Sequence, residues 1–204
     1  MTGVTTAPKL RRPTRPPRSA AVAAASRVVA GRALLPRQRL LLSEGRVISR
    51  AYVSLGANLG DDLLATLSLA TRALAELPGT RLVALSSAWR SAPVDAGGPD
   101  FLNAVAALDT ALPPVELLDA LLAIEQIHGR ERPYRHAPRT LDLDLLLHGD
   151  AVLHTARLTL PHPRLGERAF VLCPLFEIAP GLAALAVGDA WQTQRIERCG
   201  PIPH

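Results

Sequence analysis

The stretch that decides the fold reads Arg139-Thr140-Leu141-Asp142-Leu143-Asp144-Leu145-Leu146-Leu147. Its alternation predicts a β-strand over 140–147, because a strand turns residues i and i+2 to the same face. The two aspartates therefore share one face, and the leucines between them turn into a core. Leucines beside both acids favour a central strand, where two bare charges need a chemical reason. The alternative is the solvated face of an edge strand.

The two carboxylates of this strand are candidate metal ligands. Asp142 and Asp144, held side by side, repel each other unless a cation lies between them. Hard oxygen ligands of this kind suit Mg²⁺, which takes one or two carboxylates and completes its shell with substrate phosphates and water. We therefore interpret the pair as a magnesium site.

Basic side chains crowd into the loop that precedes the strand. They are Arg130, Arg132, Arg135, His136 and Arg139. Arginine offers forked donors that match phosphate oxygens, and a metal neutralises the remaining charge. An arginine-rich loop alone could be solvated surface. Next to an acid pair, it predicts a polyphosphate site.

A second polar cluster follows the strand and consists of Arg157, Thr159, His162, Arg164 and Arg168. Pro161 and Pro163 fix the backbone around His162, so we expect a displayed side chain that contacts a phosphate or moves a proton. A structural role in the turn is the alternative. The segment 56–60 lacks the Gly-Lys-Ser/Thr ending of a P-loop. Arginines and metal must then hold any nucleotide, and phosphoryl-type transfer is the predicted reaction class.

The pattern of apolar and turn-forming residues along the rest of the chain predicts an α+β fold. Short strands are expected at 51–55, 82–91, 101–108 and 140–147, and helices at 61–77 and 115–128. Asp61 is the expected cap of the first helix, and Pro113 and Pro114 open the second. These elements predict one antiparallel sheet with helices on one face.

The charge is divided unevenly along the 204 residues. Residues 1–50 hold Lys9 and ten arginines against the single acid Glu44, whereas the rest of the chain has 12 basic and 17 acidic residues. A nucleic-acid binder spreads its cations over the folded domain, so we expect no nucleic-acid partner. We divide the chain into a basic Pro/Arg/Ala-rich tail at 1–50 and a folded domain at 51–204. The tail is interpreted as disordered or as a misassigned start; a basic arm and a targeting segment stay open.

Cysteine content and hydropathy bear on the compartment. Cys173 and Cys199 are too few for a disulfide scaffold and lack the spacing of a zinc site. No stretch approaches the roughly 18–20 apolar residues that a spanning helix needs. We expect a cytoplasmic protein without a membrane partner, and a monomer.

Five segments in order resemble the 6-hydroxymethyl-7,8-dihydropterin pyrophosphokinases of folate biosynthesis. They are YVSLGANLG at 52–60, DFLNA at 100–104, RTLDLD at 139–144, LPHPR at 160–164 and RAFVL at 168–172. The resemblance implies a ferredoxin-like α-β-α sandwich with a mainly antiparallel sheet. It implies transfer of pyrophosphate from ATP to the pterin hydroxymethyl group, which leaves AMP, and two Mg²⁺ ions.

The resemblance also assigns roles to individual residues. Asp142 and Asp144 match the metal ligands, and Arg130 and Arg139 match catalytic arginines. The positions that match ATP contacts are Glu125, Arg132, Arg139, Arg157, Thr159, His162 and Arg168. The positions that match the pterin pocket are Ser91, Ala92, Val94, Phe101, Asn103, His136 and Phe170. Without the motif, Glu125 would be interpreted as an exposed helix-end acid, and Phe101 and Phe170 as core residues.

Three positions depart from the pattern of this family. His136 stands where many relatives have a tryptophan in the mobile loop, Phe101 replaces a tyrosine, and Ala92 stands where a proline is common. Two other functions remain as alternatives: a nucleic-acid-binding module on a ferredoxin-like sheet, and a relative that binds pterin without catalysis. Intact acids and arginines favour the enzyme, and we expect the activity to be retained.

Overall fold

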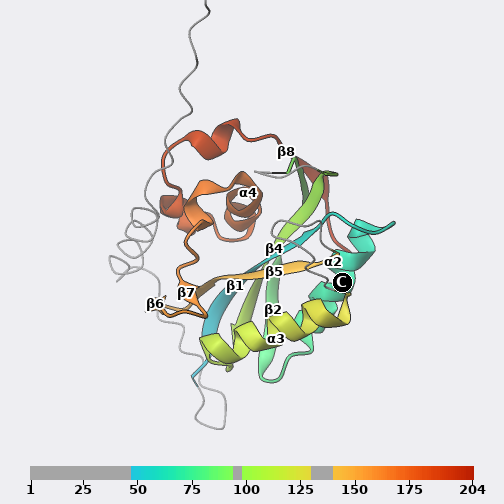
Figure 1. Cartoon of the computed structure of the whole chain (residues 1–204). Coiled ribbons are helices and arrows are strands. Elements are labelled where there is room, and N and C mark those ends of the chain that lie inside the picture. Colours follow the sequence, from blue (N-terminus) through green and yellow to red (C-terminus); the bar gives the residue numbers. More distant parts are fainter. Residues whose placement is uncertain (1–46, 94–97, 130–139) are drawn as a thin grey trace, which may run out of the picture.

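The computed structural model describes residues 47–93, 98–129 and 140–204 (Figure 1). Its main sheet is antiparallel, with strand order β5-β1-β4-β3-β8, and β2 also pairs with β4. The strands are β1 (Ser49–Ala57), β2 (Thr80–Leu85), β3 (Ala88–Ser91), β4 (Phe101–Thr110), β5 (Asp142–His148) and β8 (Ile196–Gly200). A small second sheet pairs β6 (Leu153–His154) with β7 (Thr159–Leu160).

The helices of the described chain lie on both faces of the main sheet (Figure 1). They are α2 (Leu63–Ala75), α3 (Pro114–Ile127) and α4 (Ala169–Ile178), with short 3₁₀ turns η1 (Leu165–Glu167), η2 (Pro180–Leu185) and η3 (Ala190–Thr193). The predicted α+β class with an antiparallel sheet is confirmed. The expectation of helices on one face only is wrong, because α4 covers the second face.

Two hydrophobic cores explain these layers. The first holds Leu67 and Leu74 of α2, Leu117 and Leu121 of α3, and the inward residues of β1, β4 and β5. The second packs residues of α4, such as Leu172, and of η2 against the other face of the sheet. The pattern did not predict α4 because its sequence AFVLCPLFEI is apolar almost throughout, so it shows no stripe of helical period.

The start of one helix and the extent of one strand differ from those expected from the sequence. The side chain of Asp62, not of Asp61, caps α2 by accepting from the amide of Ala65 at 2.8 Å. The strand expected at 82–91 is two strands, and Ser86 lies in the break between them. Its backbone amide donates to the carbonyl of Val105 at 3.0 Å and its hydroxyl accepts from the amide of Val105 at 2.9 Å, so the pairing with β4 continues through the break.

The strand with the two acids is at the edge of the sheet, so the expectation of a central strand is wrong. Its edge is nevertheless covered. The carboxylate of Glu125 on α3 accepts from the amide of Leu143 at 2.7 Å, and the amide of His162 donates to the carbonyl of Leu146 at 2.9 Å. This cover accounts for the leucine-rich sequence of an edge strand, since neighbouring elements bury its apolar side chains.

The first strand begins two residues before the predicted one and includes Arg50. The guanidinium of Arg50 donates to the carboxylate of Asp109 on β4 at 2.6 Å, and Arg81 on β2 donates to the same carboxylate at 2.9 Å. Burial alone would raise the pKa of Asp109, but these two cations bring it below its usual value. One buried carboxylate thus ties three adjacent strands together.

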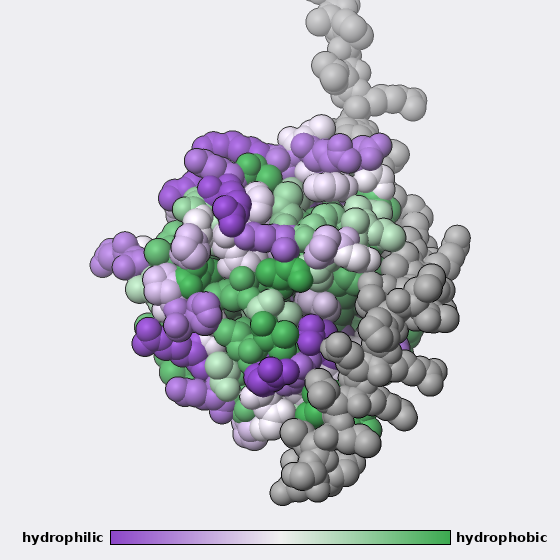
Figure 2. Space-filling view, turned by 180° about the vertical axis from the view of Figure 1, so that it is seen from behind, coloured by the Kyte–Doolittle hydropathy of each residue, from purple (hydrophilic) through white to green (hydrophobic). Residues whose placement is uncertain are grey.

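Exposed large hydrophobic side chains are scattered over the described surface. They occur singly on α2, α3, β2 and several loops, and the far side of the molecule shows green apolar areas among purple hydrophilic ones (Figure 2). Scattered residues of this kind are normal for a folded surface. Among the described residues, no helix has both the length and the apolar content to cross a membrane.

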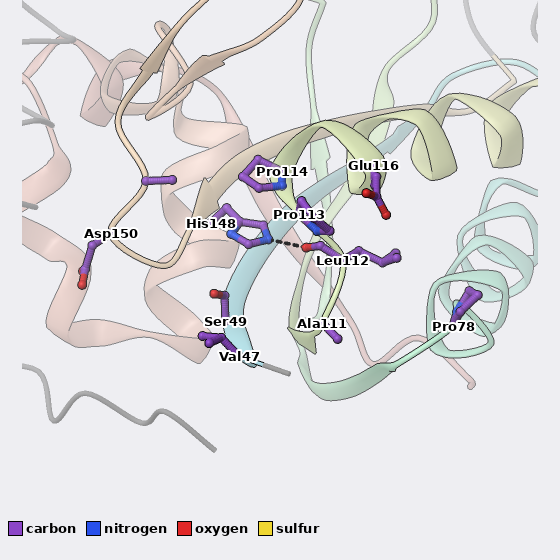
Figure 3. Close-up of a pocket in the computed structure, with 11 residues that line it drawn as sticks. Val47, Ser49, Pro78, Ala111, Leu112, Pro113, Pro114, Glu116, His148 and Asp150 are labelled. Carbon is purple, nitrogen blue, oxygen red and sulfur yellow. Dashed lines mark hydrogen bonds between the residues drawn. The ribbon is translucent and has the colours of Figure 1, made fainter. Parts of the chain in front are cut away.

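A pocket of about 750 Å³ opens at the end of β5 that is remote from the acids (Figure 3). It is lined by His148 together with Leu112, Pro113, Glu116 and Asp150. His148 is buried, and its Nε2 donates to the carbonyl of Leu112 at 2.9 Å. Burial lowers the pKa of His148 below its ordinary value.

This lowered pKa predicts a pH-dependent stability. Below about pH 6.5 the unfolded histidine binds protons that the buried side chain resists, so the free energy of unfolding decreases as the pH falls. His148→Gln cannot be protonated and removes its share of the decrease. Urea unfolding between pH 5 and pH 8 should therefore show a shallower pH dependence for the variant. An identical slope in both proteins would contradict this role of His148.

Candidate active site

The strand register brings polar residues from separate parts of the chain into one row. Asp142 on β5 lies opposite Gly56 on β1, Gly56 lies opposite Asn103 on β4, and Asn103 lies opposite Trp89 on β3. Neighbouring strands are about 4.8 Å apart, so the backbones of Asp142 and Asn103 are about 10 Å apart. The row belongs to the face that α4 covers, because the alternate residues of these strands are in the first core.

Gly56 lies between Asp142 and Asn103 and, having no side chain, forms the floor of the space between them. A methyl group added to it would lie 3.4 Å from Oδ1 of Asn103. The sequence pattern treated Gly56 as the end of the first strand, but β1 continues through it to Ala57. The pairing that gives Gly56 its place joins segments nearly 50 and 90 residues apart, which no local pattern reveals.

The acid pair has the predicted arrangement. Asp142 and Asp144 are half-buried on the α4 face, while Leu141, Leu143 and Leu145 are buried in the first core. The described ranges hold no cluster of three or more histidine, cysteine, aspartate or glutamate side chains that could bind a metal. Two carboxylates fit a cation that takes its other ligands from substrate and water, as Mg²⁺ does, rather than a site closed by protein ligands.

Arg168 lies immediately before the first residue of α4 and interacts electrostatically with Asp142 and Asp144. Burial and the nearby Arg164 lower its pKa, and the two aspartates act in the opposite direction. Its Nε is buried and has no hydrogen-bond partner among the residues that the structure describes. A buried donor without a partner costs free energy, so this guanidinium is prepared for an anionic ligand.

His162 lies between the same charges. Its Nδ1 accepts from the amide of Arg164 at 3.2 Å, which leaves Nε2 as the protonated nitrogen of the neutral ring. Burial lowers its pKa, Asp144 opposes this effect, and Arg168 and Arg164 add to it. The side chain is half-buried rather than displayed. At neutral pH it therefore offers an N–H donor without a charge.

The amide of Asn103 is oriented by β3. Its Nδ2 donates to the carbonyl of Trp89 at 3.2 Å and to the hydroxyl of Ser91 at 3.0 Å. Because a carbonyl only accepts, this pairing fixes which end of the amide faces β3. Both amide hydrogens are used, so Oδ1 is the group that faces the row across Gly56. Phe101 is half-buried on the same face, opposite Ser91.

The remaining predicted contacts are distributed around this centre. Phe170 is half-buried against the second core, with the guanidinium carbon of Arg168 5.2 Å from its ring centroid. Glu125 is buried, so the alternative of an exposed helix-end acid is wrong. Arg157 pairs with Asp119 on α3, and Thr159 begins β7 next to β5.

Several predicted site residues fall outside the described residues: Val94, Arg130, Arg132, His136 and Arg139. Ala92 is described and lies just after β3, close in sequence to Ser91. The described part of the site thus contains the acid pair, the half-buried Arg168, His162 and the oriented amide of Asn103. It combines anion-binding and amide-recognition chemistry on one face of the sheet.

Comparison with known proteins gives a consistent result. A family model described as 7,8-dihydro-6-hydroxymethylpterin-pyrophosphokinase matches residues 52–180. A 2-amino-4-hydroxy-6-hydroxymethyldihydropteridine pyrophosphokinase of Pseudomonas aeruginosa is 50% identical over 137 residues, which cover 67% of this chain and 84% of the relative. One of the same name from Methylorubrum extorquens is 44% identical over 159 residues, covering 74% of this chain and 100% of the relative.

A solved structure supports the fold. The crystal structure of Plasmodium falciparum HPPK-DHPS matches with a TM-score of 0.54 at 14% sequence identity. The match covers 69% of this chain and 42% of that one, so this chain spans less than half of the Plasmodium protein.

The floor position predicts a specific effect of Gly56→Ala. The added methyl group lies against Oδ1 of Asn103 and occupies space between the amide and the acids. We expect the affinity for 6-hydroxymethyl-7,8-dihydropterin to fall about tenfold, in line with the cost of an overfilled, well-packed site, while the midpoint of thermal unfolding stays near that of the parent chain. Calorimetric titration measures the affinity. Unchanged affinity would mean that no ligand group approaches Gly56.

Proposed function

This chain belongs to the 7,8-dihydro-6-hydroxymethylpterin-pyrophosphokinase family, and from that premise we propose how its residues perform the reaction. Pyrophosphokinase activity in folate biosynthesis follows from the membership. In the proposed reaction the hydroxymethyl oxygen of 6-hydroxymethyl-7,8-dihydropterin attacks the β-phosphorus of ATP. The oxygen–phosphorus bond forms, the bond to the α-phosphate breaks, and AMP leaves.

The observation that carries this proposal is the row on the α4 face. The register puts the acid pair on one side of Gly56 and the oriented amide of Asn103 on the other, two strands away. A phosphate-binding group and a group that recognises a flat heterocycle are therefore neighbours. Transfer between two substrates needs this proximity, because holding both in reacting position removes much of the entropic barrier.

On the phosphate side, we assign two Mg²⁺ ions to Asp142 and Asp144. When bound, they would neutralise the polyphosphate and favour ionisation of the attacking hydroxyl. The buried Nε of Arg168 and the Nε2–H of His162 are donors for phosphate oxygens, and Arg157 and Thr159 lie on the segment beside β5 for the nucleoside side. Arg130, Arg132 and Arg139 complete the proposed polyphosphate contacts, and Glu125 holds β5 in place for the nucleotide.

On the pterin side, Oδ1 of Asn103 accepts from an N–H group on the urea-like edge of the ring. An enclosed amide of this kind rejects analogues that leave it unpaired. Phe101 and Phe170 flank the ring, and Ser91 acts through the amide that it orients. Ala92, Val94 and His136 complete the proposed pocket.

We also propose a single pterin pyrophosphokinase domain at 51–204 preceded by a basic tail. The family match begins at residue 52 and β1 begins at Ser49, both close to this boundary. Cys173 and Cys199 are both free thiols, which supports a reducing compartment such as the cytoplasm. The proposed partners are the two small substrates, with neither nucleic acid nor membrane, and the proposed state is a monomer.

The reaction is tested by AMP release from ATP and Mg²⁺ with and without 6-hydroxymethyl-7,8-dihydropterin. We expect AMP to depend on the pterin, and Asp142→Asn and Asp144→Asn each to reduce turnover by about a hundredfold or more, the range for removal of one transition-state contact. Asp150→Asn is the matched control, because Asp150 follows the same strand at its remote end.

Pterin-independent AMP would contradict the proposed reaction. Near-normal turnover of either acid variant, with Asp150→Asn unchanged, would contradict the metal assignment while leaving the reaction itself in place.

A separate prediction concerns the guanidinium of Arg168. Arg168→Lys keeps one charge but loses the forked donors and the Nε–H. We expect the KM for ATP to rise about tenfold, the usual scale for one lost bond to a charged group, and the KM for the pterin to stay within about twofold. Steady-state kinetics with each substrate varied in turn measures both values. An equal rise in both KM values would show that Arg168 does not select the phosphate.

A further inference from the structure

We propose that Glu177, on the last turn of α4, is a positioning residue for pterin recognition, acting through Trp89 and Asn103. The inference rests on the proposed function, because it explains how the amide of Asn103 is held for the pterin. Within the described ranges, the hydrogen bonds of its carboxylate go to Ser87, Trp89 and Arg198, not to residues proposed to contact a substrate. Its effect reaches the site through β3, whose Trp89 it binds.

The carboxylate of Glu177 accepts four hydrogen bonds. Its Oε1 accepts from the hydroxyl of Ser87 at 2.8 Å and from Arg198 at 2.9 Å. Its Oε2 accepts from the indole Nε1 of Trp89 at 2.9 Å and from the amide of Ser87 at 3.2 Å. One side chain of α4 therefore joins the helix to the start of β3 and to β8. Such bonds to an ionised group are the stronger kind.

Trp89 connects this carboxylate to the recognition amide. Its indole N–H binds Glu177, and its backbone carbonyl accepts from Nδ2 of Asn103. A shift of Trp89 therefore moves one of the two acceptors that orient the amide. The second acceptor, Ser91, lies two residues further on the same short strand.

The start of the same helix holds one group of each proposed side, Arg168 for the phosphate and Phe170 for the pterin. Arg168 precedes the first residue of α4, Phe170 is the second, and Glu177 is in the last turn. Three bonds to Ser87 and Trp89 and one to Arg198 thus attach the far end of α4 to β3 and β8. Because the second core holds α4 independently, this attachment determines where β3, and with it the pterin-binding amide, lies relative to the helix.

A purely structural role predicts different kinetics from a positioning role. If Glu177 only stabilised the fold, its loss would lower the active fraction, and Vmax would fall with unchanged KM values. If it positions Asn103, the KM for the pterin rises while the KM for ATP does not. The two substrates together therefore distinguish the roles.

The test is Glu177→Gln in the full chain, because glutamine keeps the volume but presents an NH₂ group to two of the four donors. We expect the KM for the pterin to rise about tenfold and the KM for ATP to stay within about twofold. Glu197→Gln, at an exposed position of β8 next to Arg198, is the matched control and should leave both values unchanged.

Trp89→Phe provides a second route if the first variant folds poorly. It removes the indole donor and keeps the backbone carbonyl, and we expect a pterin KM about threefold above normal. Combining Glu177→Gln with Trp89→Phe should raise the KM for the pterin by less than the product of the two single effects, because both substitutions remove the same bond.

Three outcomes are distinguishable. A selective rise in the pterin KM for both variants supports the positioning role. A parent chain with pterin-dependent AMP release, but variants with unchanged pterin KM, overturns the inference alone. A parent chain that releases no pterin-dependent AMP overturns the proposed function and the inference together.

Discussion

The antiparallel pairing of β1 with β4 on one side and β5 on the other is the constraint on which the site depends. It sets Gly56 between Asn103 and Asp142. A slip of one residue would turn every side chain of a strand to the other face. The acids would then enter the first core, and the leucines would line the proposed phosphate site. The burial of those leucines thus maintains the orientation of the carboxylates.

The second hydrophobic core gives this face its chemistry. Packing of α4 against the sheet brings Arg168 and Phe170 over strands that are distant in the sequence. A guanidinium that loses hydration through such packing is stabilised more strongly by an ionised partner than one in water. The electrostatics of Arg168, His162 and the acid pair are therefore a consequence of where α4 sits, rather than of any one residue.

The side of the sheet turned to α2 and α3 contributes support instead of ligands. Glu125 reaches the open edge of β5 and accepts from the amide of Leu143, between the two aspartates in sequence. An edge strand without such cover is prone to pair with other chains. Covering it from α3 and from the His162 segment lets a short edge strand hold two acids in a fixed geometry.

The sequence by itself determined the α+β class, the strand with Asp142 and Asp144 on one face, and the family, because periodicity and compact motifs are local features. It did not determine the edge position of β5, the apolar helix α4 or the break at Ser86. Only the tertiary structure decided that Gly56 is a floor, that Nδ2 of Asn103 is held by Trp89, and that Glu177 joins α4 to β3. Those facts depend on contacts between residues 14 to 90 positions apart, and a local pattern does not contain the strand register or the placement of helices.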